Sequence, residues 1–157
     1  MLHFKTILHP TDFSAPSHHA WRLACCLARD HGAKLILAHV RPLSTLLYAA
    51  APMATDELSE MQVRMQLQDV APTDPKLQVD RYLLDGDASE ALLEFIEENP
   101  ADLVVMGSHG RTGLTHFVMG SVASDMVRRA SCPVLIVKQP VPETVDDPSL
   151  ELEPALV

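Results

Sequence analysis

Short runs of consecutive apolar residues alternate along this chain with longer segments of helical periodicity. Five such runs predict strands at residues 4–9, 34–40, 77–84, 103–106 and 134–137, the first of them buried and the fourth fully apolar. Four intervening segments predict helices at residues 17–30, 55–69, 88–99 and 121–130. Continuous apolar strands joined by helices are typical of a parallel sheet that is covered on both faces. We therefore predict an α/β fold with a five-stranded, parallel, doubly wound sheet and helices on both faces.

Polar and small residues mark the ends of these elements. Ser14 is a candidate N-cap for the first helix, and Gly32 stands just past its end. Thr55 is a candidate N-cap for the second helix, and the turn at residues 85–87 precedes the third. Met61 and Met65, at helical spacing on the second helix, are expected to pack against the body of the protein.

The order of the elements selects one edge of the sheet as the place for a ligand. Right-handed crossovers favour the strand order 3-2-1-4-5, which reverses direction between strands 1 and 4. Ligands of doubly wound folds bind outside the carboxyl ends of the strands at that point. The crevice would be lined by Pro10, Thr11 and Asp12 on one side and by Gly107 and its successors on the other.

Glycines are concentrated in the segment that follows the fourth strand. The chain has six glycines, and four of them lie here: Gly107, Gly110, Gly113 and Gly120. Glycine allows backbone N–H groups to approach an anion closely, and Gly120-Ser121 stands at a predicted helix N-terminus, which favours phosphate. The alternative is that these glycines only shape a loop and cap a helix. A Walker-type G-x-x-x-x-G-K-[ST] motif and a G-x-G-x-x-G turn after strand 1 are both absent from the sequence.

Two residues at the strand ends have both a binding and a structural interpretation. The Asp12 carboxylate suits a ribose hydroxyl or an adenine amino group, and it could equally fix its own turn with Thr11 and Ser14. Val40 ends the second strand, where its side chain could pack against a base or belong to the ordinary core.

Several short segments match the pattern of one known family: ILHPTDFS near the start, AHV at the end of strand 2, VVMGSHGRTGL, and CPVLIV at the last strand. Through these motifs the sequence resembles the universal stress protein family over roughly residues 2–138. The nucleotide signature of the family is glycine, two residues, glycine, nine residues, then glycine with serine or threonine. Gly107, Gly110, Gly120 and Ser121 satisfy this signature, which indicates the ATP-binding branch. One departure is His9, where the family more often has an aliphatic residue.

The resemblance implies a binding site for ATP, or for AMP or ADP. The Ser121 hydroxyl could also reach a Mg²⁺ ion that is bound through the phosphates. Asp12 and Val40 would serve the adenosine. Further pocket residues would be Pro10, Thr11 and Met106, and the ribose and phosphates would be surrounded by Gly107, His109, Gly110, Gly120, Ser121 and Val122. The resemblance also implies a homodimer formed by antiparallel pairing of strand 134–137.

Charge and composition narrow the choice of partners. The net charge is −9, which disfavours nucleic acid or an anionic membrane as the main partner. Residues 140–157 contribute five acidic residues and no basic ones, so the body carries −4. We expect a nucleotide-binding domain at residues 1–138 and a disordered, acidic, proline-rich tail at 139–157.

The cysteines and the apolar runs indicate the compartment. Cys25, Cys26 and Cys132 are expected to be free thiols in a reducing cytoplasm. We expect no membrane insertion and no signal peptide, because no apolar run approaches the roughly 20 residues that cross a bilayer.

Three functions remain for such a chain. A regulatory, stress-responsive nucleotide-binding protein needs only the phosphate loop and the adenosine contacts. A slow ATPase or phosphotransferase would also need a base and concentrated positive charge at the γ-phosphate, where the loop offers only Arg111 and two histidines. A nucleotide-free interaction module would leave the glycine pattern unexplained.

Overall fold

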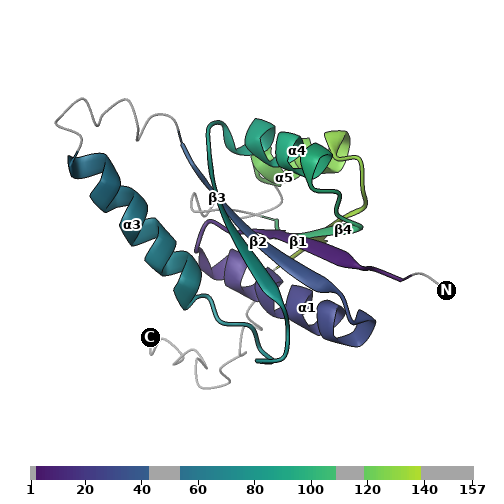
Figure 1. Cartoon of the computed structure of the whole chain (residues 1–157). Coiled ribbons are helices and arrows are strands. Elements are labelled where there is room, and N and C mark those ends of the chain that lie inside the picture. Colours follow the sequence, from purple (N-terminus) through teal and green to yellow (C-terminus); the bar gives the residue numbers. More distant parts are fainter. Residues whose placement is uncertain (1–2, 43–53, 109–118, 139–157) are drawn as a thin grey trace, which may run out of the picture.

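The computed structural model describes residues 3–42, 54–108 and 119–138 of the chain. These ranges form nine elements, most of which are labelled in Figure 1, in this order: β1 (Thr6–Pro10), α1 (Ala15–His31), β2 (Lys34–Arg41), α3 (Ala54–Asp69), β3 (Val79–Asp85), α4 (Ala88–Glu98), β4 (Leu103–Gly107), α5 (Ser121–Arg129) and β5 (Val134–Val137). The strands form one parallel sheet in the order β3-β2-β1-β4-β5. The predicted fold class is therefore confirmed.

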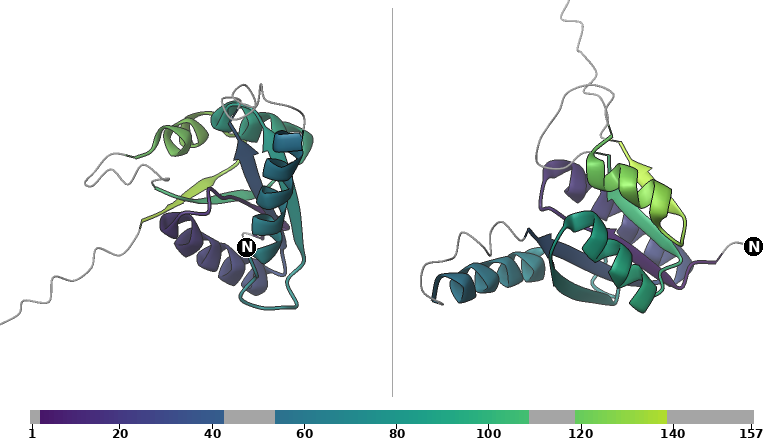
Figure 2. Two further views of the ribbon diagram at one scale, coloured as in Figure 1. Left: turned by 90° about the vertical axis from the view of Figure 1, so that its left-hand side faces the viewer. Right: turned by 90° about the horizontal axis from the view of Figure 1, so that it is seen from above.

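The sheet lies between two layers of helices, as Figure 2 shows from two directions. Successive side chains of a strand point to opposite faces, so Ile7 joins one apolar cluster and Leu8 joins the other. The first cluster contains the buried face of α1 and Leu67 from α3. The second contains α4 and α5, with Phe95 and Met126 packed on the sheet. Both faces of the central strands are buried, which explains their continuous apolar sequence.

Local capping sets the ends of α1 and α4. The Ser14 hydroxyl accepts a hydrogen bond from the Ser17 amide, so α1 begins two residues before the predicted start. Gly32 ends α1 in the left-handed conformation, with φ of 64°, and its amide bonds back to the last turn. The Asp87 carboxylate accepts the amides of Ser89 and Glu90 at the start of α4.

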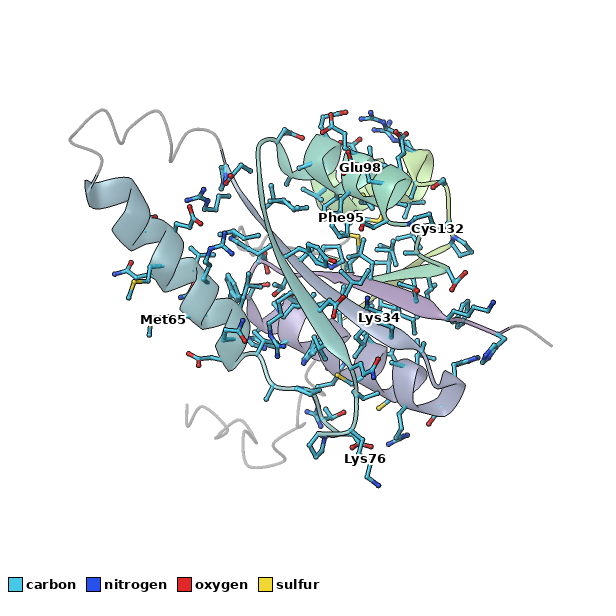
Figure 3. The ribbon with its side chains drawn as sticks, viewed as in Figure 1. Lys34, Met65, Lys76, Phe95, Glu98 and Cys132 are labelled. Atoms are coloured by element: carbon cyan, nitrogen blue, oxygen red, sulfur yellow. The ribbon has the colours of Figure 1, made fainter. Side chains whose placement is uncertain are left out.

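The helix α3 differs from expectation at two points. It begins at Ala54, so Thr55 lies inside the helix and is not its N-cap. Leu67 is 3% exposed and packs in the core, but Met61 and Met65 are 60% and 58% exposed. The prediction that these methionines pack against the body is wrong. The reason is visible in Figures 1 and 3: α3 extends past edge strand β3, and Met65 points away from the sheet.

The short strand β5 forms the edge of the sheet opposite β3. The Pro133 carbonyl accepts a hydrogen bond from the amide of Val104 in β4, and the Val137 carbonyl accepts one from the amide of Ser108, just after β4. Because backbone direction alternates along a strand, the polar groups of Val134 and Ile136 face the open side. In the described ranges, no helix is both long enough and apolar enough to span a bilayer. The predicted acidic tail lies outside the described residues.

Candidate functional site

A cavity of about 460 Å³ opens at the carboxyl ends of the strands, where β1 and β4 lie side by side. This is the switch point that the strand order predicts. Nine of the eleven predicted site residues line it: Pro10, Thr11, Asp12, Val40, Met106, Gly107, Gly120, Ser121 and Val122. The other two, His109 and Gly110, lie outside the described residues. The fold therefore brings together two segments that are about a hundred residues apart in the sequence.

The turn after β1 holds Thr11 and Asp12 at one lip of the cavity. One Asp12 carboxylate oxygen accepts hydrogen bonds from the Ser14 amide (3.0 Å) and from the Ser14 hydroxyl. The structural role that the sequence suggested for Asp12 is thus present. Asp12 nevertheless remains partly exposed and lines the cavity, so fixing the turn does not remove it from a ligand's reach.

Several bonds fix the backbone of Thr11. Its amide donates to the Ala38 carbonyl at 2.8 Å, and its carbonyl accepts from His39 Nδ1 at 2.7 Å. The His39 ring lies 4.6 Å from the ring of Phe13, whose φ of 61° is unusual for a residue other than glycine. The turn is therefore rigid on both sides of the cavity-lining hydroxyl.

The opposite lip is the N-terminus of α5. Gly120 is its N-cap residue and has no side chain to bond the first-turn amides. The Gly120 amide donates to the Ser108 carbonyl, which ties the start of the helix to the end of β4. In the described part of the chain, no side-chain cap bonds the first turn at Ser121 and Val122, whereas α1 and α4 have such caps. Unsatisfied N–H groups and the helix dipole favour an anion at this place.

A left-handed backbone conformation does not explain the glycines at the two lips. Neither Gly107 nor Gly120 adopts a positive φ; among the described glycines only Gly32 and Gly86 do. A β-carbon at Gly107 would lie 3.2 Å from the backbone carbon and oxygen of Pro16. Gly107 is therefore needed because α1 approaches the end of β4 closely, and not because the chain turns into a left-handed conformation.

The wall between the two lips is mainly apolar. Val40, Met106 and Leu92 contribute aliphatic side chains from β2, β4 and α4. The predicted site did not include eight other lining residues: Ser17, Ala38, His39, Pro42, Ala88, Leu92, Ser108 and Ala123. Leu92 and Ala88 were hidden because they belong to ordinary helical periodicity. Only the crossover that carries α4 over the sheet brings them to the strand ends.

His9 lies beneath the cavity and is completely buried. Its Nδ1 lies 2.7 Å from the Val105 carbonyl and its Nε2 lies 3.3 Å from the Ser17 hydroxyl. Burial lowers the pKa of His9 to about 4, although the Val105 carbonyl and the Asp12 carboxylate act in the opposite direction. The ring is consequently neutral at pH 7. Its two hydrogen bonds explain how a polar residue is tolerated where an aliphatic residue is more usual.

The described residues contain no group of three or more His, Cys, Asp or Glu that could hold a metal ion. Fold and cavity together define a doubly wound α/β domain with a mainly apolar cavity, bordered by polar groups, at its switch point. Across residues 3–138 the chain matches the model of the universal stress protein family. The chain therefore belongs to the universal stress protein family, as the motifs predicted.

Individual relatives agree with this assignment. The chain is 32% identical to universal stress protein MJ0531 of Methanocaldococcus jannaschii, over 89% of this chain and 85% of the relative. It is similar to the solved structure of MJ0577, with 25% identity, a TM-score of 0.74, and coverage of 89% and 99%. A solved universal stress protein in complex with cAMP is 27% identical, with a TM-score of 0.56 and coverage of 87% and 98%.

Proposed function

We propose that this protein binds an adenine nucleotide, ATP or its relatives AMP and ADP, and acts as a regulatory protein in the stress response. The observation that carries the proposal is the composition of one cavity. An apolar wall, a carboxylate and an uncapped helix N-terminus surround about 460 Å³, a volume typical of small-ligand sites. A nucleotide has the three matching parts: a flat base, a ribose with hydroxyl donors, and anionic phosphates.

The adenosine would occupy the side formed by β1 and β2. Val40 and Met106 offer apolar contact to the base, and Asp12 can accept a hydrogen bond from an amino group or a ribose hydroxyl. The rigid turn at Thr11 and Asp12 supports this arrangement, since its groups are already ordered before a ligand arrives.

The phosphates would lie at the start of α5. The first-turn amides of Ser121 and Val122 can donate to phosphate oxygens, and the Ser121 hydroxyl adds a donor or a ligand for a phosphate-bound Mg²⁺. Each charge at such a helix end gains about 0.3–1 kcal/mol when exposed, and more when partly buried. The predicted contributions of His109 and Gly110 would come from the loop that joins β4 to α5.

The chemistry of the cavity favours nucleotide binding without efficient hydrolysis or phosphoryl transfer. The described residues that line the cavity include no lysine or arginine to neutralise charge on a γ-phosphate. Arg111 and His116, named as candidate cations from the sequence, fall outside the described residues. The solved relative in complex with cAMP supports an adenine ligand in this family.

The assembly and the compartment complete the proposal. The open edge of β5 would pair with the β5 of a second copy to form a homodimer, because an unpaired apolar edge invites a partner strand. The three cysteines are free, with Cys25 buried, and this is consistent with a reducing cytoplasm.

The test is to purify the protein, denature it and identify released nucleotide by mass spectrometry. We expect an adenine nucleotide in the wild type. Replacing Gly120 by valine places a branched side chain at the proposed phosphate position and should abolish retention. Ala130→Val, at the other end of the same helix, is the matched control and should retain the nucleotide. Equal retention in both variants would show that the N-terminus of α5 is not the phosphate site.

A further inference from the structure

Three side chains form a continuous hydrogen-bonded chain from the core to the wall of the cavity. His9 Nε2 lies 3.3 Å from Ser17 Oγ, and Ser17 Oγ lies 2.9 Å from Thr11 Oγ1. Thr11 Oγ1 also accepts the Phe13 amide at 3.1 Å. Ser17 and Thr11 line the cavity, whereas His9 is fully buried and is not part of the lining.

The state of the His9 ring fixes one end of this chain. The Val105 carbonyl can only accept, so the hydrogen of the neutral ring must be on Nδ1, which lies 2.7 Å from it. Burial holds the pKa of His9 near 4, against the opposing effects of Val105 and Asp12 and with a small contribution from His18 in the same direction as burial. Nε2 is therefore a bare acceptor at pH 7, and its neighbour is the Ser17 hydroxyl.

The direction in which the Ser17 and Thr11 hydroxyls donate follows from the number of hydrogens and lone pairs that each group has. Each hydroxyl has one hydrogen and two lone pairs. If Ser17 donates to His9, then Thr11 must donate to Ser17, and one Thr11 lone pair accepts from Phe13. The second lone pair of Thr11 can then accept a hydrogen bond from a ligand in the cavity. If Ser17 instead donates to Thr11, both Thr11 lone pairs are occupied, its hydrogen turns to the cavity, and buried His9 Nε2 loses its donor, which is unfavourable.

We propose that His9 acts through Ser17 as a positioning residue that makes the Thr11 hydroxyl a hydrogen-bond acceptor toward the cavity, so that Thr11 selects ligands with a donor at that point. The proposal rests on the proposed nucleotide-binding function for the identity of the ligand. The donor would be a ribose hydroxyl or the exocyclic amino group of adenine. An aliphatic residue at position 9 would leave Ser17 to donate to Thr11, which would then face the cavity as a donor.

The first experiment needs no ligand. Long-range ¹H–¹⁵N NMR correlations of the imidazole ring report which nitrogen carries hydrogen, and His9→Leu identifies the His9 signals among the eight histidines. We expect Nδ1–H and a bare Nε2 at pH 7. Hydrogen on Nε2, or on both nitrogens, would overturn the proposal, because Ser17 would then be free to donate to Thr11.

The second experiment compares the affinities of ATP, 2′-deoxy-ATP, 3′-deoxy-ATP and ITP. In the wild type, the analogue that lacks the donor facing Thr11 should bind about tenfold more weakly than ATP, the usual effect of one hydrogen bond. The identity of that analogue distinguishes the ribose hydroxyls from the amino group. Thr11→Val should bring the ratio close to one, and Thr11→Ser, which keeps the hydroxyl, should preserve it.

The decisive variants are His9→Leu and Ser17→Ala, which leave Thr11 in place. Both should reduce the tenfold ratio to less than about threefold, and a loss of folding in one leaves the other as the test. A ratio unchanged in a folded His9→Leu or Ser17→Ala protein would overturn the positioning role. A wild-type protein that binds none of the four nucleotides would overturn the proposed function, while the NMR result would still decide the state of the chain.

Discussion

Burial of the uncharged His9 ring makes the stability of the protein depend on pH in a defined direction. The pKa of His9 is lowered from 6.5 to about 4 in the folded state, so the unfolded chain binds the extra proton between these values. Stability from this residue is present above pH 6.5 and is lost as the pH falls toward 4. We expect unfolding in urea at pH 5 to require about 2 kcal/mol less than at pH 7 from this residue.

Two variants isolate this effect. His9→Leu should remove most of the pH dependence between 7 and 5, whatever its stability at pH 7. His18→Gln, which replaces an exposed histidine of α1, should keep the wild-type difference. The interpretation fails if the two variants show the same difference between pH 7 and pH 5.

Gly107 gives a second prediction at the level of a single residue. Its β-carbon position lies against the Pro16 backbone at 3.2 Å, and backbone moves less readily than a side chain. Gly107→Ala should therefore lower the free energy of unfolding by about 1–3 kcal/mol, the usual effect of overpacking. Gly107→Asn should be worse.

Gly32 is the contrasting case, because it has open space around it and a φ of 64°. Asparagine tolerates that conformation, so Gly32→Asn should be milder than Gly32→Ala. Urea unfolding of the four variants checks both statements. If asparagine and alanine rank in the same order at the two positions, crowding at Gly107 is not the cause.

At the level of elements, α3 offers two sets of apolar residues with opposite environments. Met61 and Met65 are largely exposed, whereas Leu67 is buried in the first core cluster. The double replacement of both methionines by glutamine should change the free energy of unfolding by less than about 0.5 kcal/mol, as surface changes usually do. Leu67→Ala should cost about 2–5 kcal/mol. A large loss from the methionine variant would mean that α3 packs through its outer face.

The same helix shows where prediction from sequence stops. Hydrophobic periodicity predicted each strand and helix of the described residues, because a strand inside a covered sheet needs apolar residues and a helix needs an apolar face at its own spacing. The sequence could not predict that α3 extends past β3. The spacing of apolar residues shows which of them share a helix face, but it does not show whether another element packs against that face. The site divides in the same way. Residues at strand ends, such as Thr11 and Gly107, follow from topology, whereas Ala88 and Leu92 arrive from a helix whose position is set by packing.

At the level of the whole molecule, the proposed homodimer can be tested at β5. Leu135 is 37% exposed beside the open edge, so antiparallel pairing of two β5 strands would bring two copies of its side chain close together. Leu135→Glu would then oppose like charges and should convert a dimer to a monomer in sedimentation experiments. Leu23→Glu, with the same residue type and the same exposed fraction on α1, should remain dimeric. A wild-type monomer would remove the basis for pairing through β5.

The ladder between β1 and β4 contains only two registered pairs, Ile7 with Leu103 and Leu8 with Val104, whereas the ladder between β2 and β3 contains seven. Fewer residues are thus paired between the two strands at the switch point than between any other two neighbouring strands of the sheet. A ligand that contacts both Asp12, which follows β1, and the start of α5, which follows β4, would link these two strands. Hydrogen exchange of the amides along β1 and β4 would then be slower when the ligand is bound. A partner protein could detect this change in the domain without contacting the ligand.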